Sequence, residues 1–312
     1  MTYIRLSQSR VARTRRLWRA LAIWALLFAS TICGQDPSPP AADPAIHPES
    51  QSDVFDRVIA NEKQMELALD EYERTEKVEA RRIGSDAKPE VRVWRLFPAG
   101  PAMNKLPISV DGNPVNPEVY RESLEKLEKY LVWAAQGGAA QQEAYAKAQR
   151  KRKERGDLIA TTHDAFVFSR VGAEKRGEAT LAKYAMVPNP KFKAGTRNAI
   201  IFSKVRGTVW IDEQSGELAR IEGSVVEDIS ISLFLAKVYK GSHFMQERYE
   251  MIPGHWFPSY EQYDFDGRKF VVPFAIHERT FYSDYKRVGP PKDAVGVVRD
   301  ELSKLAGEQT TK

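Results

Sequence analysis

Few residues of this chain have the types and the spacing that catalysis or metal binding requires. The five histidines, the side chains most often used as bases and ligands, are His47, His163, His243, His255 and His277. His243 and Glu247 have the spacing of two ligands on a helix, but their surroundings alternate like a strand, which would hold them about 13 Å apart. His163 precedes Asp164, yet no serine or cysteine nucleophile motif accompanies the pair. The pattern therefore predicts neither a metal centre nor a catalytic histidine.

The acidic residues give a similar result. Asp264 and Asp266 before Gly267 resemble the opening of a calcium loop, but Ala275 stands at the twelfth position, where that loop needs an acid. We expect a hairpin turn at Asp266-Gly267 instead. The chain also contains no phosphate loop, dinucleotide fingerprint or nucleophile elbow. The sequence thus predicts a protein that is not an enzyme and uses no cofactor.

The first 34 residues have the features of a secretory signal. They contain six arginines and no acid, and an apolar run from Ala20 to Cys33 ends at a proline-rich segment. That run is shorter than the roughly 20 apolar residues of a membrane span. We expect cleavage after Cys33 or Gly34 and a periplasmic mature chain. The alternatives are an uncleaved anchor and lipidation of Cys33, although Ile32 stands where a lipoprotein signal has a small residue.

Composition limits what the mature chain can bind. Six of the 47 basic residues lie in 1–34, so the rest carries 41 basic against 42 acidic residues, and such a neutral balance argues against nucleic acid. Cys33 is the single cysteine, so no disulfide is expected. The basic run 150–155 could form a patch for lipid headgroups or acidic partners, but such a run is more typical of a solvated helical face.

The first half of the chain predicts helices with strands between them. Residues 35–52 form a Pro/Ala-rich tether. A helix follows over Val54–Leu69; its apolar stripe, interrupted by Glu62 and Glu66, consists of Val54, Phe55, Val58, Ile59, Met65 and Leu69. KPEVRVWRLF predicts a strand. A second helix starts after Asn116, with a stripe of Tyr120, Leu124, Leu127, Leu131 and Ala134. Gly137-Gly138 ends it, and residues 137–157 read as a charged helical insert.

From Asp164 onward the pattern changes to strands. The predicted strands are DAFVFSRV, ATLAKYAMVP, NAIIFSKV, GTVWID, GELARIEGSVV, HFMQERYEMI, HWFPSYEQYDF and RKFVVPFAIHERTFYSDY. Short turns between them indicate an antiparallel meander. ISLFLAKVYKGS is the exception and could be a short helix or a loop over a sheet edge. The predicted organisation is one α+β domain over 53–290 and a C-terminal tail over 291–312.

These segments resemble the outer-membrane lipoprotein-sorting superfamily of LolA, LolB and RseB-like domains, and especially an uncharacterised, acidobacterial-type branch. The resemblance covers about Asp53 to Val288 and is carried by VRVWRLFPAG with VDGNPVNPE, DAFVFSRVG, IFSKVRGTVWIDEQSGELARIEG and ERTFYSDYKRV. It implies a strongly curved antiparallel sheet, an unclosed β-barrel, with helices over its concave face and an apolar cavity between them. No lipid-contacting residue of those carriers matches a position in this chain.

The expected function follows from the resemblance. It implies an exported, non-catalytic binding protein of the cell envelope that carries the acyl chain of a lipid or lipoprotein. The alternatives are an RseB-like regulatory sensor with an envelope protein partner, and an envelope hydrolase. The helices at Val54–Leu69 and Tyr120–Ala134 would cover the concave face. The candidate cavity residues are Phe55, Leu124, Leu131, Phe166, Phe168, Trp210 and Trp256, which an ordinary core would equally explain.

Overall fold

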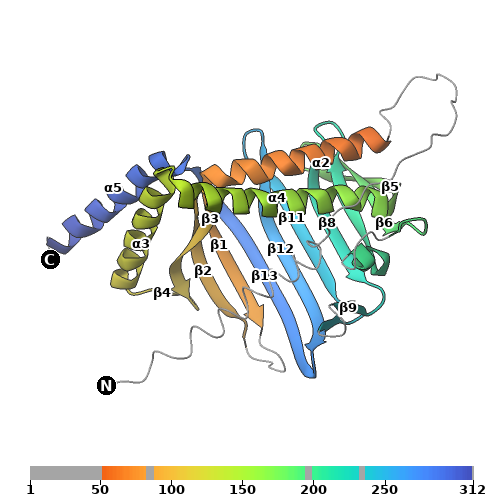
Figure 1. The fold of residues 1–312 in the computed structure, drawn as a ribbon. Helices are drawn as coiled ribbons and strands as arrows, with labels where there is room; N and C mark the ends of the chain where they lie inside the picture. The colour runs from red at the N-terminus through yellow and green to blue at the C-terminus, as the bar shows by residue number, and fades with distance from the viewer. Residues whose placement is uncertain (1–50, 82–87, 194–198, 232–235, 311–312) are drawn as a thin grey trace.

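A computed structural model of the chain describes residues 51–81, 88–193, 199–231 and 236–310 (Figure 1). The strands are β1 Tyr72–Arg81, β2 Glu90–Ala99, β3 Ala102–Val110, β4 Asn113–Pro114, β5 Phe166–Arg176, β6 Ala179–Pro188, β7 Val205–Asp212, β8 Glu217–Val225, β9 Ile229–Ile231, β10 Ala236–Val238, β11 His243–Ile252, β12 His255–Lys269 and β13 Val272–Arg287. The helices are α2 Gln51–Ala68, α3 Pro117–Ala135, α4 Ala139–Ala165 and α5 Pro291–Thr310, with 3-10 turns η1 Leu69–Glu71 and η2 Ala199–Lys204. The predicted signal and most of the tether lie outside the described residues.

All 13 strands form one antiparallel sheet that curves without closing. Its order is β4-β3-β2-β1-β13-β12-β11-β8-β7-β6-β5, and the short strands β9 and β10 extend it beside β12. Strand β1 brings the N-terminal half into the sheet by pairing with β13, the last strand of the chain. The two end strands, β4 and β5, do not pair with each other. The predicted fold class, an α+β protein with an unclosed, strongly curved antiparallel sheet, is confirmed.

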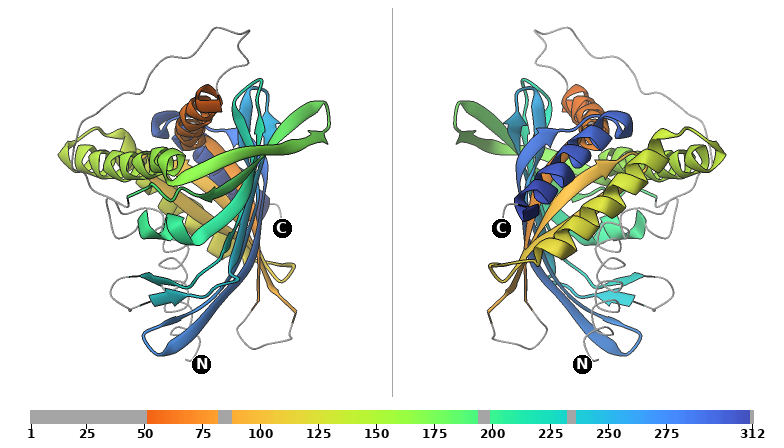
Figure 2. Two further views of the ribbon diagram at one scale, coloured as in Figure 1. Left: turned by 90° about the vertical axis from the view of Figure 1, so that its right-hand side faces the viewer. Right: turned by 90° about the vertical axis from the view of Figure 1, so that its left-hand side faces the viewer.

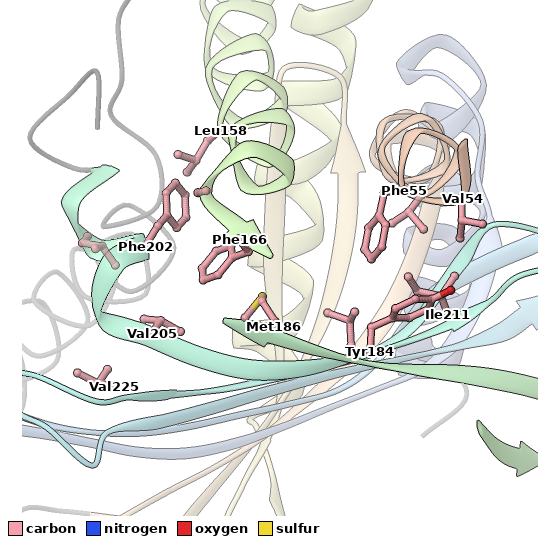
Figure 3. Packing of buried hydrophobic residues seen from close by; sticks show 14 of the residues in the cluster. Val54, Phe55, Leu158, Phe166, Tyr184, Met186, Phe202, Val205, Ile211 and Val225 are labelled. Atoms are coloured by element: carbon pink, nitrogen blue, oxygen red, sulfur yellow. The ribbon is translucent and has the colours of Figure 1, made fainter. Parts of the chain in front are cut away.

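Helices α2 and α4 lie on the concave side of this sheet, as the two turned views show (Figure 2). The apolar stripe of α2 packs on the β5–β8 part of the sheet, where Phe55 lies 4.1 Å from Phe168 and 5.4 Å from Tyr184 between ring centroids. Figure 3 shows Phe55 above Tyr184 and Ile211, with Leu158 of α4 closing the other side of the same cluster. This cluster is the larger of two main cores and fills the space under the helices with side chains.

Helix α3 packs elsewhere than expected. Its stripe, Leu124, Leu127 and Leu131, contacts Phe97 and Leu106 of the sheet. Side chains alternate along a strand, and Leu106 follows Lys105, which binds Glu76. Glu76 lies opposite Tyr282, whose side chain packs in the cluster under α2 on the concave side. Leu106 and the stripe of α3 therefore meet on the opposite face of the β2–β3 end, so the expectation that this helix covers the concave face is wrong.

The C-terminal segment is also part of this second core. Residues 291–310 form α5 rather than a tail, and Ala294, Val295 and Val298 are buried against α3. Arg95 of β2 joins both helices to the sheet, since its Nη1 lies 2.6 Å from Glu301 and 3.0 Å from the Tyr120 hydroxyl. The α3–α5 pair thus caps the β1–β3 end of the sheet.

Three local expectations differ from the structure. NAIIFSKV was expected as a strand but contains η2, in which the consecutive residues Ile201 and Phe202 are both buried. ISLFLAKVYKGS, expected as a short helix or a loop, contains strand β10 and the last residue of β9, while its residues 232–235 lie outside the described part of the chain. Asp266-Gly267 is not a turn, because β12 continues to Lys269 and the hairpin turns at Phe270-Val271. Within the described part of the chain, no helix is both long and apolar enough to cross a membrane.

Candidate functional site

A groove of about 690 Å³ runs along the C-terminal half of α2. Its other wall comes from the β7–β8 turn, the β11–β12 turn and the ends of β1 and β13. The lining residues are Asn61, Gln64, Met65, Leu67, Ala68, Glu71, Tyr72, Glu217, Gly254, His255, Trp256, Phe257 and Arg287. This volume lies within the roughly 300–1,000 Å³ of typical small-molecule pockets. The groove is therefore large enough to hold a ligand.

Two turns position this wall, and the first of them is held against α2. In the β7–β8 turn, Gly216 has φ +75°, and a Cβ there would lie 2.7 Å from the Cβ of Arg57, so glycine lets the turn approach the helix. Asn61 Nδ2 of α2 donates to the carbonyl oxygen of Ser215 at 3.0 Å. In the β11–β12 turn, the amide of Gly254 donates to Glu250 at 2.7 Å. These contacts bring Glu217 and His255 to the same groove.

Aromatic rings form the floor of the groove. The imidazole of His255 stacks on Phe257 with centroids 5.4 Å apart and planes within 3°, and Phe257 in turn stacks on Tyr285 at 4.9 Å. Tyr72 meets the edge of Phe257 at 5.0 Å. Met65, Ala68 and Leu69 from α2 and η1 pack against this ring cluster. The floor is aromatic and built from both halves of the chain.

The rim is polar and partly titratable. Glu71 accepts two hydrogen bonds from Arg287, at 2.9 and 2.6 Å, across one end of the groove. At the other end, burial raises the pKa of the Glu217 carboxyl to about 7, and the nearby Glu62 raises it further while Arg248 opposes the shift. About half of the Glu217 carboxyls are consequently protonated near neutral pH, and the protonated carboxyl can donate a hydrogen bond. The rim can therefore hydrogen-bond to a polar group whose apolar part lies on the rings.

Three ion pairs, of which one is buried, hold α2 and the turn η1 that follows it, and with them the groove. Glu62 binds Arg248 of β11 at 2.7 Å. Glu66 binds Arg155, and Asp70 binds Arg152, at 3.0 and 2.5 Å. The acids that interrupt the stripe of α2 thus face arginines, and the basic run 150–155 supplies two of them. These two residues join α4 to α2 instead of forming a purely solvated face.

The seven predicted cavity residues are distributed over separate places. Phe55, Phe166 and Phe168 belong to the core under α2 and α4. Leu124 and Leu131 belong to the α3–α5 core, and Trp210 is buried with Leu181 and Ala219 in a small cluster against which Trp256 packs. Trp256 is the one member of the set that also lines the groove. Contact of any of these residues with an acyl chain stays a prediction.

The other candidate residues form no metal centre among the residues that the structure describes. His277 lies between Asp264 and Asp266, at 3.1 and 3.3 Å, and Arg279 binds Asp264 at 2.9 Å, so the two acids that resemble the opening of a calcium loop contact basic side chains of β13. His243 lies 3.2 Å from the hydroxyl of Ser224. From the sequence, Glu217 and His255 are ordinary turn residues, and no local signal marks them, because only the sheet topology brings their turns together.

Comparisons with known proteins give structural matches only. No family model and no curated protein matches the chain. A putative outer membrane lipoprotein-sorting protein domain from Vibrio parahaemolyticus matches 75% of this chain and 93% of its own length, with 11% identity and a TM-score of 0.31. A LolA superfamily protein from Nitrosomonas europaea matches 76% and 92%, with 9% identity and a TM-score of 0.30.

The Pseudomonas aeruginosa MucA/MucB complex contains a chain that matches 76% of this one and 98% of its own length, with 9% identity and a TM-score of 0.20. Two of these three structures are described as proteins of the superfamily that the sequence resembles. At such TM-scores the matches carry no argument about function. What the groove can do follows from its own residues.

Proposed function

We propose that this chain is an exported, non-catalytic binding protein of the cell envelope, and that the groove beside α2 holds the acyl chain of a lipid or lipoprotein. The two-part lining of the groove carries this proposal. A floor of stacked rings with Met65 and Ala68 suits a hydrocarbon chain, whose burial contributes about 0.8 kcal/mol per methylene. A rim with Glu71, Arg287 and Glu217 suits the polar group at the end of that chain.

The chemistry of the lining supports binding rather than acyl transfer. Among the groove residues there is no serine, threonine or cysteine, the side chains that most often attack an ester. His255, the histidine of the groove, stacks flat on Phe257, which holds its ring as part of the floor. The non-catalytic assignment and the periplasmic location remain parts of the proposal.

A fluorescent fatty acid tests the proposal directly. We expect saturable binding to the protein and displacement by an acylated peptide. Ala68→Trp places a bulky ring inside the groove and should weaken binding by at least tenfold, because the indole occupies the volume of the chain. Ala60→Trp is the matched control, since Ala60 is exposed on the same helix and does not line the groove. Both variants should unfold at similar temperatures.

Two results would overturn the proposal in different ways. Binding that Ala68→Trp leaves unchanged would place the acyl site elsewhere in the molecule. The absence of binding by any acyl probe would contradict the proposed function itself. Native mass spectrometry of protein purified from its own envelope adds an independent readout, because a retained lipid would be weighed with the chain.

A further inference from the structure

The tip of the β12–β13 hairpin displays Val271 and Val272, the two most exposed large apolar side chains in the described part of the protein, next to Phe270. Phe270 is 54%, Val271 87% and Val272 63% exposed, and the three are consecutive. The hairpin extends beyond its neighbours at the lower end of the sheet (Figure 1). Single exposed apolar residues are common on protein surfaces, but three in a row at a protruding turn form a patch that favours a partner.

The backbone of the tip is strained to present this patch. Phe270 has φ +54°, in the left-handed region that glycine and asparagine adopt most easily. A turn at this place would fold more easily with one of those residues. Phe270 is more than half exposed and belongs to none of the hydrophobic clusters of the described residues. The strain is therefore explained better by a use for the exposed ring than by stability.

Positive charge lies immediately beside the apolar tip. Arg268 and Lys269 precede Phe270, and Arg268 donates to the carbonyl oxygen of Phe270 at 3.1 Å, which keeps its guanidinium at the turn. Residues 267–277 contain no acid. Lys237 of β10 lies opposite Arg268 in register. Asp228 forms an ion pair with Lys237 at 2.7 Å. The end of the hairpin is thus apolar at its tip and cationic directly behind it.

We propose that this tip, residues 268–272, inserts into the surface of a lipid bilayer that contains anionic lipids. An aromatic and aliphatic tip backed by arginine and lysine matches the layered chemistry of such a surface, acyl chains below and anionic headgroups above. The tip is convex, so a protein partner would need a matching cleft, whereas a bilayer accommodates a protrusion of any shape. The charge pattern selects an anionic surface over a neutral one.

This inference does not depend on the acyl groove. His255 in the groove and Lys269 at the tip stand at opposite ends of β12, a strand of 15 residues that spans roughly 45 Å when extended. A bilayer held by the tip would therefore lie far from the groove. Variants at one end should leave the other unaffected, so the two proposals can fail separately.

A tryptophan at the tip tests the inference in the full chain. Phe270→Trp should shift its added emission to the blue on vesicles of phosphatidylethanolamine and phosphatidylglycerol, and brominated acyl chains should quench it. This signal reports position 270, whatever residues 1–50 contribute to membrane binding. Val171→Trp is the matched control, because Val171 is 56% exposed on the edge strand β5, and it should stay unquenched. Emission of the parent chain is subtracted in each case.

The charge and the apolar side chains have separate tests in the Phe270→Trp background. Arg268→Gln with Lys269→Gln should weaken vesicle association about 30-fold. Val271→Ser with Val272→Ser should reduce the quenching at least tenfold, with melting temperature as the check of folding. Unshifted emission on anionic vesicles would overturn the proposal, and so would equal quenching on phosphatidylcholine vesicles. A blue shift that appears without lipid and grows with protein concentration would assign the tip to a second copy of the chain instead.

Discussion

Glu62 of α2 and Arg248 of β11 form an ion pair at 2.7 Å in the interior of the protein. Each residue is only 8% exposed. Burial raises the pKa of the Glu62 carboxyl, and the charge of Arg248 opposes that rise. Two further nitrogens of Arg248, Nε and Nη1, are buried without a hydrogen-bond partner among the described residues, so the guanidinium depends on Glu62. The pair joins the helical wall of the groove to the strand that leads into the β11–β12 turn.

Glu62→Gln should destabilise the protein by about 3–5 kcal/mol, because it leaves the charge of Arg248 buried and uncompensated. Urea unfolding measures the change. The double variant Glu62→Met with Arg248→Met should be more stable than either single variant, since it removes both charges. Glu66→Gln is the control: its partner Arg155 is 34% exposed in its side chain, so about 1 kcal/mol or less is expected. Additive effects in the Glu62–Arg248 cycle would contradict the pairing.

Glu217 should make both stability and ligand binding depend on pH. Its pKa is raised to about 7 in the fold, from the 4.5 of an ordinary glutamate, so between these two pH values the native state holds a proton that the unfolded state has lost. Stability should therefore decrease as pH rises from about 4.5 to 7, by the linkage of proton binding to unfolding. Melting temperatures across this range, with Glu217→Gln for comparison, measure the effect.

The titration of Glu217 should also affect the binding of a negatively charged acyl probe. Binding in the groove should weaken above pH 7, where Glu217 becomes an anion at the rim, and Glu217→Gln should remove that dependence. A pH dependence that persists unchanged in Glu217→Gln would show that it does not come from Glu217.

Elements defined by local pattern were predictable. The hairpin of β7 and β8 follows from β-branched runs around a Ser-Gly turn, and the start of α3 follows from Asn116, whose side chain caps the amide of Glu118 at 2.8 Å. The curvature and openness of the sheet are predicted only by the resemblance, because an alternating pattern predicts strands but not how far a sheet closes. An amphipathic stripe likewise predicts that one side of a helix is buried, but it does not identify the element that buries it. For this reason the expectation that α3 covers the concave face is wrong.

Gly267 shows how tertiary contacts override a turn signal. Asp-Gly is a strong turn pair, yet here glycine lies within a strand because a Cβ would meet the carbonyl oxygen of Lys237 at 2.1 Å and the ring of Phe274 at 2.6 Å. The glycine serves close packing of β10 and β13. The candidate site cannot be predicted from the sequence for the same reason: Glu217 and His255 come to line one groove only after distant strands pair. A short-range sequence pattern does not predict which distant residues come together in the fold.

Aspartate substitutions on strand β7 test the two-sided burial of the sheet. Trp210 is 2% and Ile211 0% exposed, on opposite faces of the strand. Ile211→Asp should cost several kcal/mol, since it places an unpaired charge in the core under α2. Trp210→Asp should cost a similar amount, because the indole packs on Leu181 and Ala219 and donates to Glu174 at 2.8 Å. If both variants melt like the parent, the strand assignment is wrong.

The last prediction separates the strain at the hairpin tip from its proposed use. Phe270→Gly should be more stable than Phe270→Ala by about 1 kcal/mol, because both lack the ring but only glycine adopts φ +54° without a steric cost. Chemical unfolding measures this difference. Both variants should associate less with anionic vesicles than the parent chain, since each has lost the ring that enters the bilayer. A glycine variant that is more stable and binds vesicles as well as the parent would show that the ring at position 270 has no part in membrane contact.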